Sequence, residues 1–269
     1  PELWNDSFNF EFRNKLQSYV DEERMNFFCI SENSKQDFCK FTGIDTTRVV
    51  VTPLAANNKT FYVCQNREEE LRVRRKYSID NSSYFFCFSS FSGRKNQILL
   101  LQAIKLFFKK FPNSDVKLVL AGSGVNDSGL KDLEACKEFI LREDLEKRIH
   151  LLGFVEEKDF PPLMSNCLSF LYPSLYEGFG LQVLEAMQCG APVIASDTSS
   201  IPEVVGDAGI SLPPDNAELW AQAMERVYES KELQKELSGK SLERASLFSW
   251  KKTVSKMLEA FELNQEVSL

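Results

Sequence analysis

The sequence lacks the residues from which most metal centres are built. It contains a single histidine, His150, and its seven cysteines form no Cys-x-x-Cys pair; Asp-x-Asp is absent too. A protein site for a transition metal or Mg²⁺ needs several such ligands close together, so we expect a protein that works without a metal or a resident cofactor. His150 stands in an apolar stretch, where a satisfied core residue is the simpler interpretation.

Long apolar runs and an excess of positive charge are also missing. No run approaches the ~20 residues that a membrane-spanning helix needs, and no signal-peptide pattern is visible. The formal net charge of −7 argues against general nucleic-acid binding. Cysteines such as Cys29, Cys87 and Cys167 stand in apolar segments, which is typical of reduced core residues. We therefore expect a cytoplasmic protein that binds no nucleic acid.

From residue 84 onward, apolar runs alternate with helical patterns, which indicates an α/β protein with a parallel sheet flanked by helices. The predicted strands are 84–90, 116–121, 149–155, 168–172, 192–196 and 209–212. The predicted helices are 94–110, 127–142, 157–166, 180–189 and 215–229, followed by a helical segment over 231–265.

The N-terminal part shows a separate pattern. Residues 8–24 have helical spacing, and two short buried strands, at 26–31 and 48–53, flank a helix that Ser31 begins and Gly43 ends. The charge-rich segment 68–76 is most simply a solvated helix face. Since the chain starts at Pro1 and enters a helical pattern almost at once, we expect a fragment of a longer protein.

The chain is organised around the stretch from Leu171 to Asp197. An apolar strand end is followed by a turn with Gly178 and Gly180, then by a short apolar helix that Gly190 ends, and then by a second apolar strand. Two parallel strands need such a crossover connection. The helix is apolar on nearly every side, which indicates that it is buried.

Two glutamates of this stretch are candidate binding residues. Glu185 lies inside the apolar helix, where a carboxylate is costly unless it receives hydrogen bonds, and a sugar diol supplies two donors. Glu177 belongs to the turn before the helix, whose free N–H groups and positive dipole end suit a phosphate. For each glutamate alone there is a simpler alternative: Glu185 pairs with a basic residue, and Glu177 is solvated.

A second candidate anion site lies in Ser92-Gly-Arg-Lys-Asn-Gln97, at the predicted start of a helix. Arg94 and Lys95 stand where the helix dipole disfavours cations, and a bound anion would reverse that balance. Solvated surface bases are the alternative.

Three other motifs carry less weight. Ala121-Gly-Ser-Gly124 lacks the third glycine of a dinucleotide fingerprint, and Gly239-Lys-Ser241 lacks the first glycine of a P-loop. Ser200-Ile-Pro-Glu203 fits a capping box, which predicts that Ser200 and Glu203 cap a helix.

The run Glu177-Gly-Phe-Gly-Leu-Gln-Val-Leu-Glu185-Ala-Met, followed by Gly190-Ala-Pro-Val-Ile-Ala, closely resembles the donor-site signature of glycosyltransferase family 4. These group 1 glycosyltransferases are retaining enzymes of the GT-B fold. The resemblance covers roughly residues 25–255 and is strongest over 84–215. It implies a Rossmann-like parallel sheet flanked by helices, here the C-terminal donor domain with a remnant of the N-terminal domain.

The resemblance assigns roles around the glycine turn. Glu177 would contact the hydroxyls of the donor sugar, and Glu185 would bind the ribose hydroxyls. The main-chain amides from Phe179 through Gly180 to Leu181, in the turn that Gly178 opens, would hold the sugar and the diphosphate. The implied catalytic residues are Glu177 and, from the other loop, Lys95.

Further donor-binding residues follow from the same resemblance. The family has a phosphate-binding lysine at this Arg-Lys-Asn, which implies Lys95 first and Arg94 second. Many members have an arginine five residues earlier, where Ser90 stands here, so the second diphosphate contact has no counterpart. Gly122 would pack beside the nucleotide, and the main chain at Phe154 would contact the base.

The implied domain organisation is a truncated N-terminal acceptor-side domain over 1–53, a linker over 54–61, a donor domain over 62–248, and a helix over 249–269 that returns towards the N-terminal half. The implied partners are a nucleotide-sugar donor and a glycan or lipid-linked acceptor. Peripheral association with the inner face of the membrane would occur through the missing half.

The function implied is a hexosyl transfer with retention, from a nucleotide diphosphate sugar to an acceptor hydroxyl, in polysaccharide or glycolipid biosynthesis. The residues of the Arg-Lys-Asn and Ser-Ser-Ile-Pro-Glu motifs are similar to those of mannosyltransferases, which suggests GDP-mannose as the donor. Alone, the fragment should bind the donor but turn it over poorly. Two alternatives stay open: a nucleotide-sugar epimerase on a GT-B scaffold, and a non-catalytic nucleotide-sugar-binding module.

Overall fold

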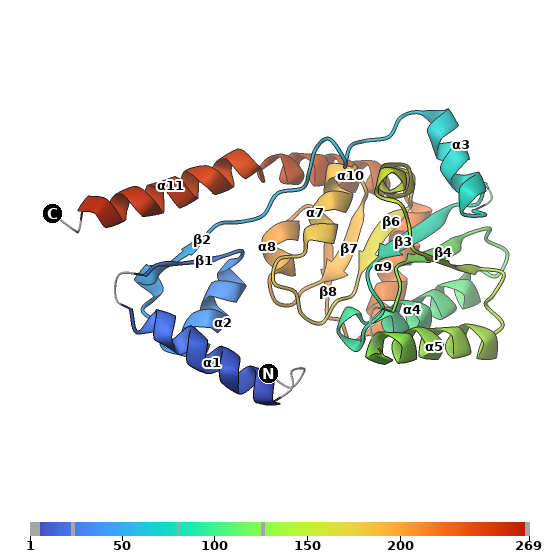
Figure 1. The fold of residues 1–269 in the computed structure, drawn as a ribbon. Helices are drawn as coiled ribbons and strands as arrows, with labels where there is room; N and C mark the ends of the chain where they lie inside the picture. The colour runs from blue at the N-terminus through green and yellow to red at the C-terminus, as the bar shows by residue number, and fades with distance from the viewer. Residues whose placement is uncertain (1–5, 23–24, 80, 125–126, 267–269) are drawn as a thin grey trace. The chain divides into compact units, whose positions relative to one another are not determined.

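The computed structural model describes residues 6–22, 25–79, 81–124 and 127–266. The chain divides into two compact units, Ala55–Ser249 and a smaller one formed by Pro1–Leu54 with Trp250–Leu269. Figure 1 shows the elements of each unit, and the larger one contains the main sheet. Which domain roles these segments have stays a prediction.

The larger unit is built on six parallel strands in the order β5-β4-β3-β6-β7-β8. They are β3 (Tyr84–Phe88), β4 (Lys117–Ala121), β5 (Ile149–Gly153), β6 (Ser169–Tyr172), β7 (Val193–Ser196) and β8 (Ile210–Leu212). In the centre, Phe86 of β3 stands opposite Val119 of β4 and Phe170 of β6. All six predicted strands are confirmed, and the sheet is parallel as the alternating pattern indicates.

The strands are connected by helices α4 (Gln97–Lys110), α5 (Asp127–Arg142), α6 (Phe160–Ser165), α7 (Leu181–Gln188), α8 (Ile201–Val205), α9 (Ala217–Glu229) and α10 (Lys231–Ser246), with 3-10 turns η2 (Gly93–Lys95) and η3 (Glu157–Asp159). The predicted helix over 94–110 begins later than expected. Asn96 adopts a left-handed conformation with φ of 57°, and it separates η2 from α4. Arg94 and Lys95 therefore lie in the turn before the helix and not in its first turn.

The hydrophobic core of the larger unit lies between the sheet and the helices α4, α5 and α9. Helix α4 is apolar around much of its surface and is accordingly buried, since α9 and α5 both pack against it. The Phe85 ring of β3 meets the Phe107 ring of α4 edge to face, with 5.6 Å between centroids. This packing fixes the loop between β3 and α4.

The strand order places a topological switch point between β3 and β6. The chain proceeds from β3 towards β4 and β5 on one side, and from β6 towards β7 and β8 on the other. In open parallel sheets, ligands bind beyond the carboxyl ends of the strands at such a point, because the two loops there diverge and leave a crevice. The residues after β3 and those after β6 are therefore brought to one place.

The smaller unit has a two-stranded parallel sheet of β1 (Phe27–Cys29) and β2 (Val49–Val51). Its helices are α1 (Asp6–Val20), α2 (Glu32–Thr42) and α11 (Trp250–Glu266), with a 3-10 turn η1 (Thr46–Arg48). The predicted ends of α2 are confirmed: the Ser31 hydroxyl accepts the Ser34 N–H at 3.0 Å, and Gly43 ends the helix with φ of 73°. Within the described ranges, no helix combines the length and the apolar character needed to cross a bilayer.

Helix α3 (Arg67–Lys76) differs from the expectation of a merely solvated helix. Its Arg72 and Lys76 side chains pair with Asp159, at 2.7 and 2.6 Å, and the carboxylate of Asp159 is inaccessible to solvent. The Tyr77 hydroxyl donates to the same carboxylate at 2.9 Å. These charges anchor α3 to η3, a contact that the local sequence of α3 cannot reveal.

Candidate functional site

A cleft of about 700 Å³ lies at the carboxyl ends of the central strands. It is lined by residues at the end of β3, in the loops after β3, β4, β5 and β6, in helices α6 and α7, and in the segment before α3. These residues are Phe61, Phe88, Ser90, Arg94, Lys95, Gly122, Ser123, Phe154, Val155, Glu157, Phe160, Glu177, Gln182 and Glu185. Six of the ten residues predicted to bind the donor line this cleft. They are Arg94, Lys95, Gly122, Phe154, Glu177 and Glu185.

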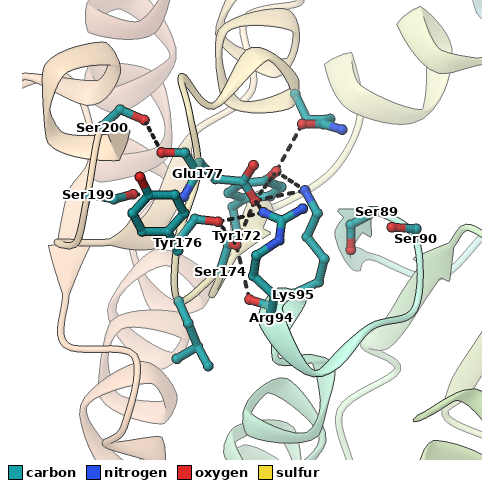
Figure 2. A network of polar contacts seen from close by, with 12 residues as sticks. Ser89, Ser90, Arg94, Lys95, Tyr172, Ser174, Tyr176, Glu177, Ser199 and Ser200 are labelled. Atoms are coloured by element: carbon teal, nitrogen blue, oxygen red, sulfur yellow. Dashed lines mark hydrogen bonds and ion pairs between the residues drawn. The ribbon is translucent and has the colours of Figure 1, made fainter. Parts of the chain in front are cut away.

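The Glu177 carboxylate is the centre of a polar network at one end of the cleft (Figure 2). Its Oε1 accepts hydrogen bonds from Lys95 Nζ at 2.8 Å and Ser174 Oγ at 2.6 Å, and it lies 2.8 Å from an Arg94 guanidinium nitrogen. The glutamate is only 8% exposed, so the alternative of a solvated side chain is wrong. Its second oxygen, Oε2, accepts no hydrogen bond within the described part of the chain, which leaves it available to a ligand.

Tyr172, at the end of β6, holds the two charged partners together. Its hydroxyl accepts from Lys95 Nζ at 2.7 Å and lies 3.0 Å from Glu177 Oε1 and 2.9 Å from Gln182 Oε1. The Lys95 ammonium also lies 5.0 Å from the centroid of the Tyr172 ring. The ring is buried against Phe170, with centroids 6.0 Å apart and nearly parallel planes.

The ion pair shifts the pKa of both partners. Burial lowers the pKa of Lys95, and the attraction of Glu177 offsets only part of that shift. Burial by itself raises the pKa of Glu177, but the charge of Lys95 and the hydrogen bonds from Lys95 and Ser174 outweigh it and hold the pKa below its ordinary value. Glu177 is therefore a carboxylate at neutral pH, beside two cations that an anionic ligand can recruit.

The main chain of Glu177 is fixed by the loop before α8. Its N–H donates to Ser199 Oγ and its carbonyl accepts from Ser200 Oγ, both at 2.8 Å (Figure 2). The predicted capping role of Ser200 is wrong, because its side chain makes no hydrogen bond to the first turn of α8. The hydroxyl is already committed to the Glu177 carbonyl across the loop.

Glu185 points into the same cleft from helix α7 and has no ion-pair or hydrogen-bond partner among the described residues. The simpler alternative, pairing with a basic residue, therefore does not hold for this part of the chain. Burial raises the pKa of Glu185 to about 7, and repulsion from Glu157 contributes to the shift. A half-buried carboxylate that receives no hydrogen bonds is stabilised by a ligand whose hydroxyl groups donate to it.

The glycine turn presents main-chain donors and does not line the cleft. Gly180 has φ of 98°, which favours glycine, and the helix α7 begins directly after it. Within the described residues, the N–H groups of Phe179, Gly180 and Leu181 donate no hydrogen bond. The Phe179 side chain is buried against Phe248, with ring centroids 6.0 Å apart. The donor-binding roles of Gly178, Phe179, Gly180 and Leu181 stay predictions.

Gly122 and Phe154 both line the cleft, Gly122 at a tight contact between two loops and Phe154 with an exposed side chain. A Cβ atom at Gly122 would stand 1.9 Å from the Ser89 carbonyl oxygen, and the residue has φ of +132°, so only glycine fits this close approach of two loops. Phe154 is 80% exposed although its ring is apolar. An exposed aromatic ring beside a polar cleft suits the face of a planar ligand.

Several residues of the site were not identified from the sequence. Tyr172 and Ser174 stand five and three residues before Glu177, and this proximity was the one signal that pointed to them. The contact between Phe88 and Phe160, two aromatic residues of the cleft, could not be predicted from the sequence. These residues lie 72 positions apart and meet only in the fold, with ring centroids 4.2 Å apart. Phe61, from the segment before α3, packs on Phe160 at 6.4 Å.

The polar groups of the cleft do not gather as metal ligands do. In the ranges that the structure describes, no group of three or more histidine, cysteine, aspartate and glutamate side chains is placed to hold a metal ion. His150 lies half-buried on the edge strand β5, outside the cleft.

Known proteins with similar sequences point to one family. The sequence model of the family described as glycosyl transferases, group 1, matches residues 69–244. The O-antigen chain mannosyltransferase B of Escherichia coli is 32% identical over 249 residues, which is 92% of this chain and 63% of that protein. The serotype-specific mannosyltransferase WbdA of Escherichia coli is 27% identical over 96% of this chain, which corresponds to 31% of its own length.

Solved structures show the same fold. A glycosyltransferase from Rickettsia africae ESF-5 matches with a TM-score of 0.81 at 19% identity, over 97% of this chain and 68% of that one. Anabaena Alr3699/HepE in complex with UDP and glucose matches with a TM-score of 0.80 at 21% identity, over 93% of this chain and 67% of that one. With the family match over more than half of its residues, the chain belongs to the group 1 glycosyltransferases and has their GT-B type of fold.

Proposed function

We propose that this chain forms the donor site of a retaining glycosyltransferase that moves a hexose from a nucleoside diphosphate sugar to an acceptor hydroxyl. The observation that carries the proposal is the arrangement of one cleft. One end of the cleft holds two cations and a carboxylate: Arg94, Lys95 and Glu177. The same cleft is lined by Glu185, a carboxylate that receives no hydrogen bond from the described residues. A diphosphate between a sugar and a ribose presents the complementary groups in that order.

The cations would stabilise the leaving diphosphate. Negative charge grows on the diphosphate oxygens as the bond to the sugar breaks, and fixed positive groups in a partly dry cleft stabilise that charge. Lys95 is 5% exposed and held by Tyr172 and Glu177, so it needs little reorganisation before the reaction. The N–H groups at the start of α7, which donate no hydrogen bond within the described ranges, would add to the same effect.

The two glutamates would bind different parts of the donor. Glu185 would accept hydrogen bonds from the two ribose hydroxyls, which provide the donors that its carboxylate lacks. The second oxygen of Glu177 would accept from a hydroxyl of the sugar, because this oxygen remains free while Oε1 is held by Lys95 and Ser174. Phe154 would lie beside the base.

For the donor we propose GDP-mannose. The similar proteins from Escherichia coli are mannosyltransferases by name. A second carboxylate, Glu157, lines the cleft and lies near enough to Glu185 to raise its pKa. The Watson–Crick edge of guanine carries adjacent N–H donors that a carboxylate accepts in pairs, whereas the edge of uracil offers one.

For the whole enzyme, we propose that the acceptor is a growing glycan or a lipid-linked saccharide and that the acceptor site lies outside this chain. The chain spans 63% of the length of O-antigen chain mannosyltransferase B and about a third of WbdA. Turnover and acceptor choice are therefore properties to be measured on the longer protein.

A thermal-shift experiment tests the donor-site proposal. The chain would be melted with UDP, GDP, ADP and TDP, each with EDTA and with Mg²⁺. A ligand at ~100 times its dissociation constant adds ~2.7 kcal/mol to the free energy of unfolding, which is a visible shift. We expect the largest shift with GDP and no change on adding EDTA. A failure of all four nucleotides would contradict the donor site. A strict need for Mg²⁺ would contradict charge stabilisation by the protein's own cations, and a preference for UDP would contradict GDP-mannose as the donor.

A further inference from the structure

Hydroxyl groups at the end of β7 and in the loop from β7 to α8 hold the peptide segment that carries Glu177. The Ser196 hydroxyl donates to the Ser174 carbonyl at 2.5 Å, and the Thr198 hydroxyl reaches the same oxygen at 3.3 Å. The next two residues of the loop hold Glu177 itself: the Ser199 hydroxyl accepts the N–H of Glu177 and the Ser200 hydroxyl donates to its carbonyl, both at 2.8 Å (Figure 2). Both ends of the Glu177 residue are therefore tied to successive serines.

The contact at Ser199 has a conformational cost. Ser199 has φ of 50°, in the left-handed region that a residue with a Cβ atom seldom adopts. Such backbone conformations are strained and persist where the surroundings enforce them, often at ligand sites. Here the enforced conformation turns the Ser199 hydroxyl towards the Glu177 N–H.

The serines serve a purpose other than helix capping. Ser200 directly precedes α8 but gives no side-chain hydrogen bond to it, and it is wholly buried beneath the Glu177 loop. The hydroxyl of a residue in that position normally accepts from the first turn. In this chain the capping bond is absent, and the bond to the Glu177 carbonyl is present in its place.

We propose that Ser199 and Ser200 are positioning residues of the donor site, which fix the main chain of Glu177 and so direct its carboxylate at the hydroxyls of the donor sugar. The inference rests on the proposed function, in which Glu177 meets the sugar. Its geometric basis is that Oε1 is already held by Lys95 and Ser174, so the direction of Oε2 is determined by where the backbone stands. A small shift of the backbone would move Oε2 away from the sugar and leave the two cations free to hold the diphosphate.

The test compares two ligands across matched variants of the chain, by calorimetry with GDP and with GDP-mannose. Ser199→Ala, Ser199→Gly and Ser200→Ala should each weaken GDP-mannose by about 3- to 10-fold, the loss of one hydrogen bond, and change GDP by less than about twofold. Ser199→Gly should melt higher than Ser199→Ala, because glycine adopts the left-handed conformation freely, yet bind GDP-mannose equally weakly.

Ser241→Ala is the matched control. Ser241 is a buried serine whose hydroxyl donates to the Ala191 carbonyl at 2.8 Å, outside the cleft. It should lower the melting temperature and leave both affinities unchanged. A purely structural role for Ser199 and Ser200 predicts the same behaviour as this control, with no preferential loss of the sugar-bearing ligand, and that result would overturn the inference.

A double-mutant cycle separates the inference from the proposed function. In a Glu177→Gln background, adding Ser200→Ala should weaken GDP-mannose by less than about twofold more, because the positioned carboxylate is already gone. An additive loss would overturn the positioning role. If Glu177→Gln itself weakens GDP and GDP-mannose equally, the role proposed for Glu177 fails, and the inference fails with it. If Glu177→Gln selectively weakens GDP-mannose and the serine variants do not, only the positioning role fails.

Discussion

Lys95 Nζ and Glu177 Oε1 lie 2.8 Å apart, although 82 positions separate the two residues in the sequence. The contact joins the loop after β3 to the loop after β6, across the switch point of the sheet. Both side chains are nearly inaccessible, at 5% and 10% exposed, so each partner compensates a buried charge of the other. An Arg94 guanidinium nitrogen also lies 2.8 Å from Glu177 Oε1, so the carboxylate keeps a cationic partner if an anionic ligand draws the lysine away.

The first prediction concerns Lys95. Lys95→Ala should weaken GDP binding by ~1.5–3 kcal/mol, as the loss of a charged hydrogen bond does, and leave guanosine binding nearly unchanged. Calorimetry with both ligands measures the difference. Lys105→Ala is a control, since Lys105 of α4 pairs at 2.5 Å with Glu143, just after α5, and does not line the cleft. Equal losses for GDP and guanosine would mean that Lys95 acts on the fold or the base.

The second prediction is that Glu185→Gln stabilises the unliganded chain. The pKa of Glu185 is about 7 in the folded chain against an ordinary value of 4.5, chiefly through burial. Since the folded state binds the proton more tightly, the free energy of unfolding falls as pH rises from about 4.5 to 7. Removing the carboxyl should therefore raise the free energy of unfolding by about 1–3 kcal/mol at pH 8 and change it little at pH 4.

Denaturant unfolding at the two pH values decides this prediction. A destabilisation of ~3–5 kcal/mol at pH 8 would contradict it, because that is the effect of orphaning a buried partner cation.

The third prediction is a pH dependence of donor binding. Ribose hydroxyls donate to a carboxylate and so favour its charged form, which means that GDP-mannose affinity should rise with pH up to about pH 7 and then level off. Glu185→Gln should flatten this profile. GDP-mannose is the suitable ligand, because its diphosphate is esterified at both ends and has no group that titrates near neutral pH. An unchanged slope in the variant would assign the titration to another group.

One part of the predicted site, from Glu177 to Glu185, lies in one continuous stretch of the sequence. Glu177, the glycine turn, Glu185 and the following strand are local neighbours, so turn, helix and strand signals combine within a few residues and place both glutamates in the fold. The six parallel strands were predictable for a similar reason: each is a short apolar run bounded by turn signals. Neither inference needs a contact between distant segments.

What the sequence did not predict depends on such contacts. The start of α4 is set by Asn96, whose side-chain amide donates to the carbonyl of Pro214 at 2.7 Å, 118 positions away, and this tertiary bond accompanies its left-handed conformation. Ser200 fits a capping pattern, yet the Glu177 carbonyl, 23 positions away, takes its hydroxyl. The charged residues of α3 have the pattern of a solvated helix face. In the fold, Arg72 and Lys76 instead bind Asp159, which lies more than 80 positions later in the sequence.

The fourth prediction follows from that last contact. Asp159→Ala should lower the free energy of unfolding by about 3 kcal/mol, because it removes a buried carboxylate that serves Arg72, Lys76 and Tyr77. Burial opposes the charge of Asp159, but the bonds from Lys76, Arg72 and Tyr77 hold its pKa below the ordinary value of 3.8. The stabilisation is therefore present at neutral pH and is lost as pH falls below about 4.

Thermal and denaturant unfolding measure this effect, with Asp115→Ala as the control. Asp115 is exposed, so its removal should change the free energy of unfolding by no more than about 0.5 kcal/mol. A loss at Asp159 as small as that at Asp115 would show that α3 is held by other contacts.

The measurement that tests the central claim most directly is a calorimetric titration of Glu177→Gln and Glu185→Gln with GDP and with GDP-mannose. The account predicts that Glu185→Gln weakens both ligands, because it removes an acceptor of the ribose that both carry. It predicts that Glu177→Gln spares GDP and weakens GDP-mannose, because Glu177 meets only the sugar. Identical ligand profiles for the two variants would contradict the division of the cleft into a nucleotide end and a sugar end.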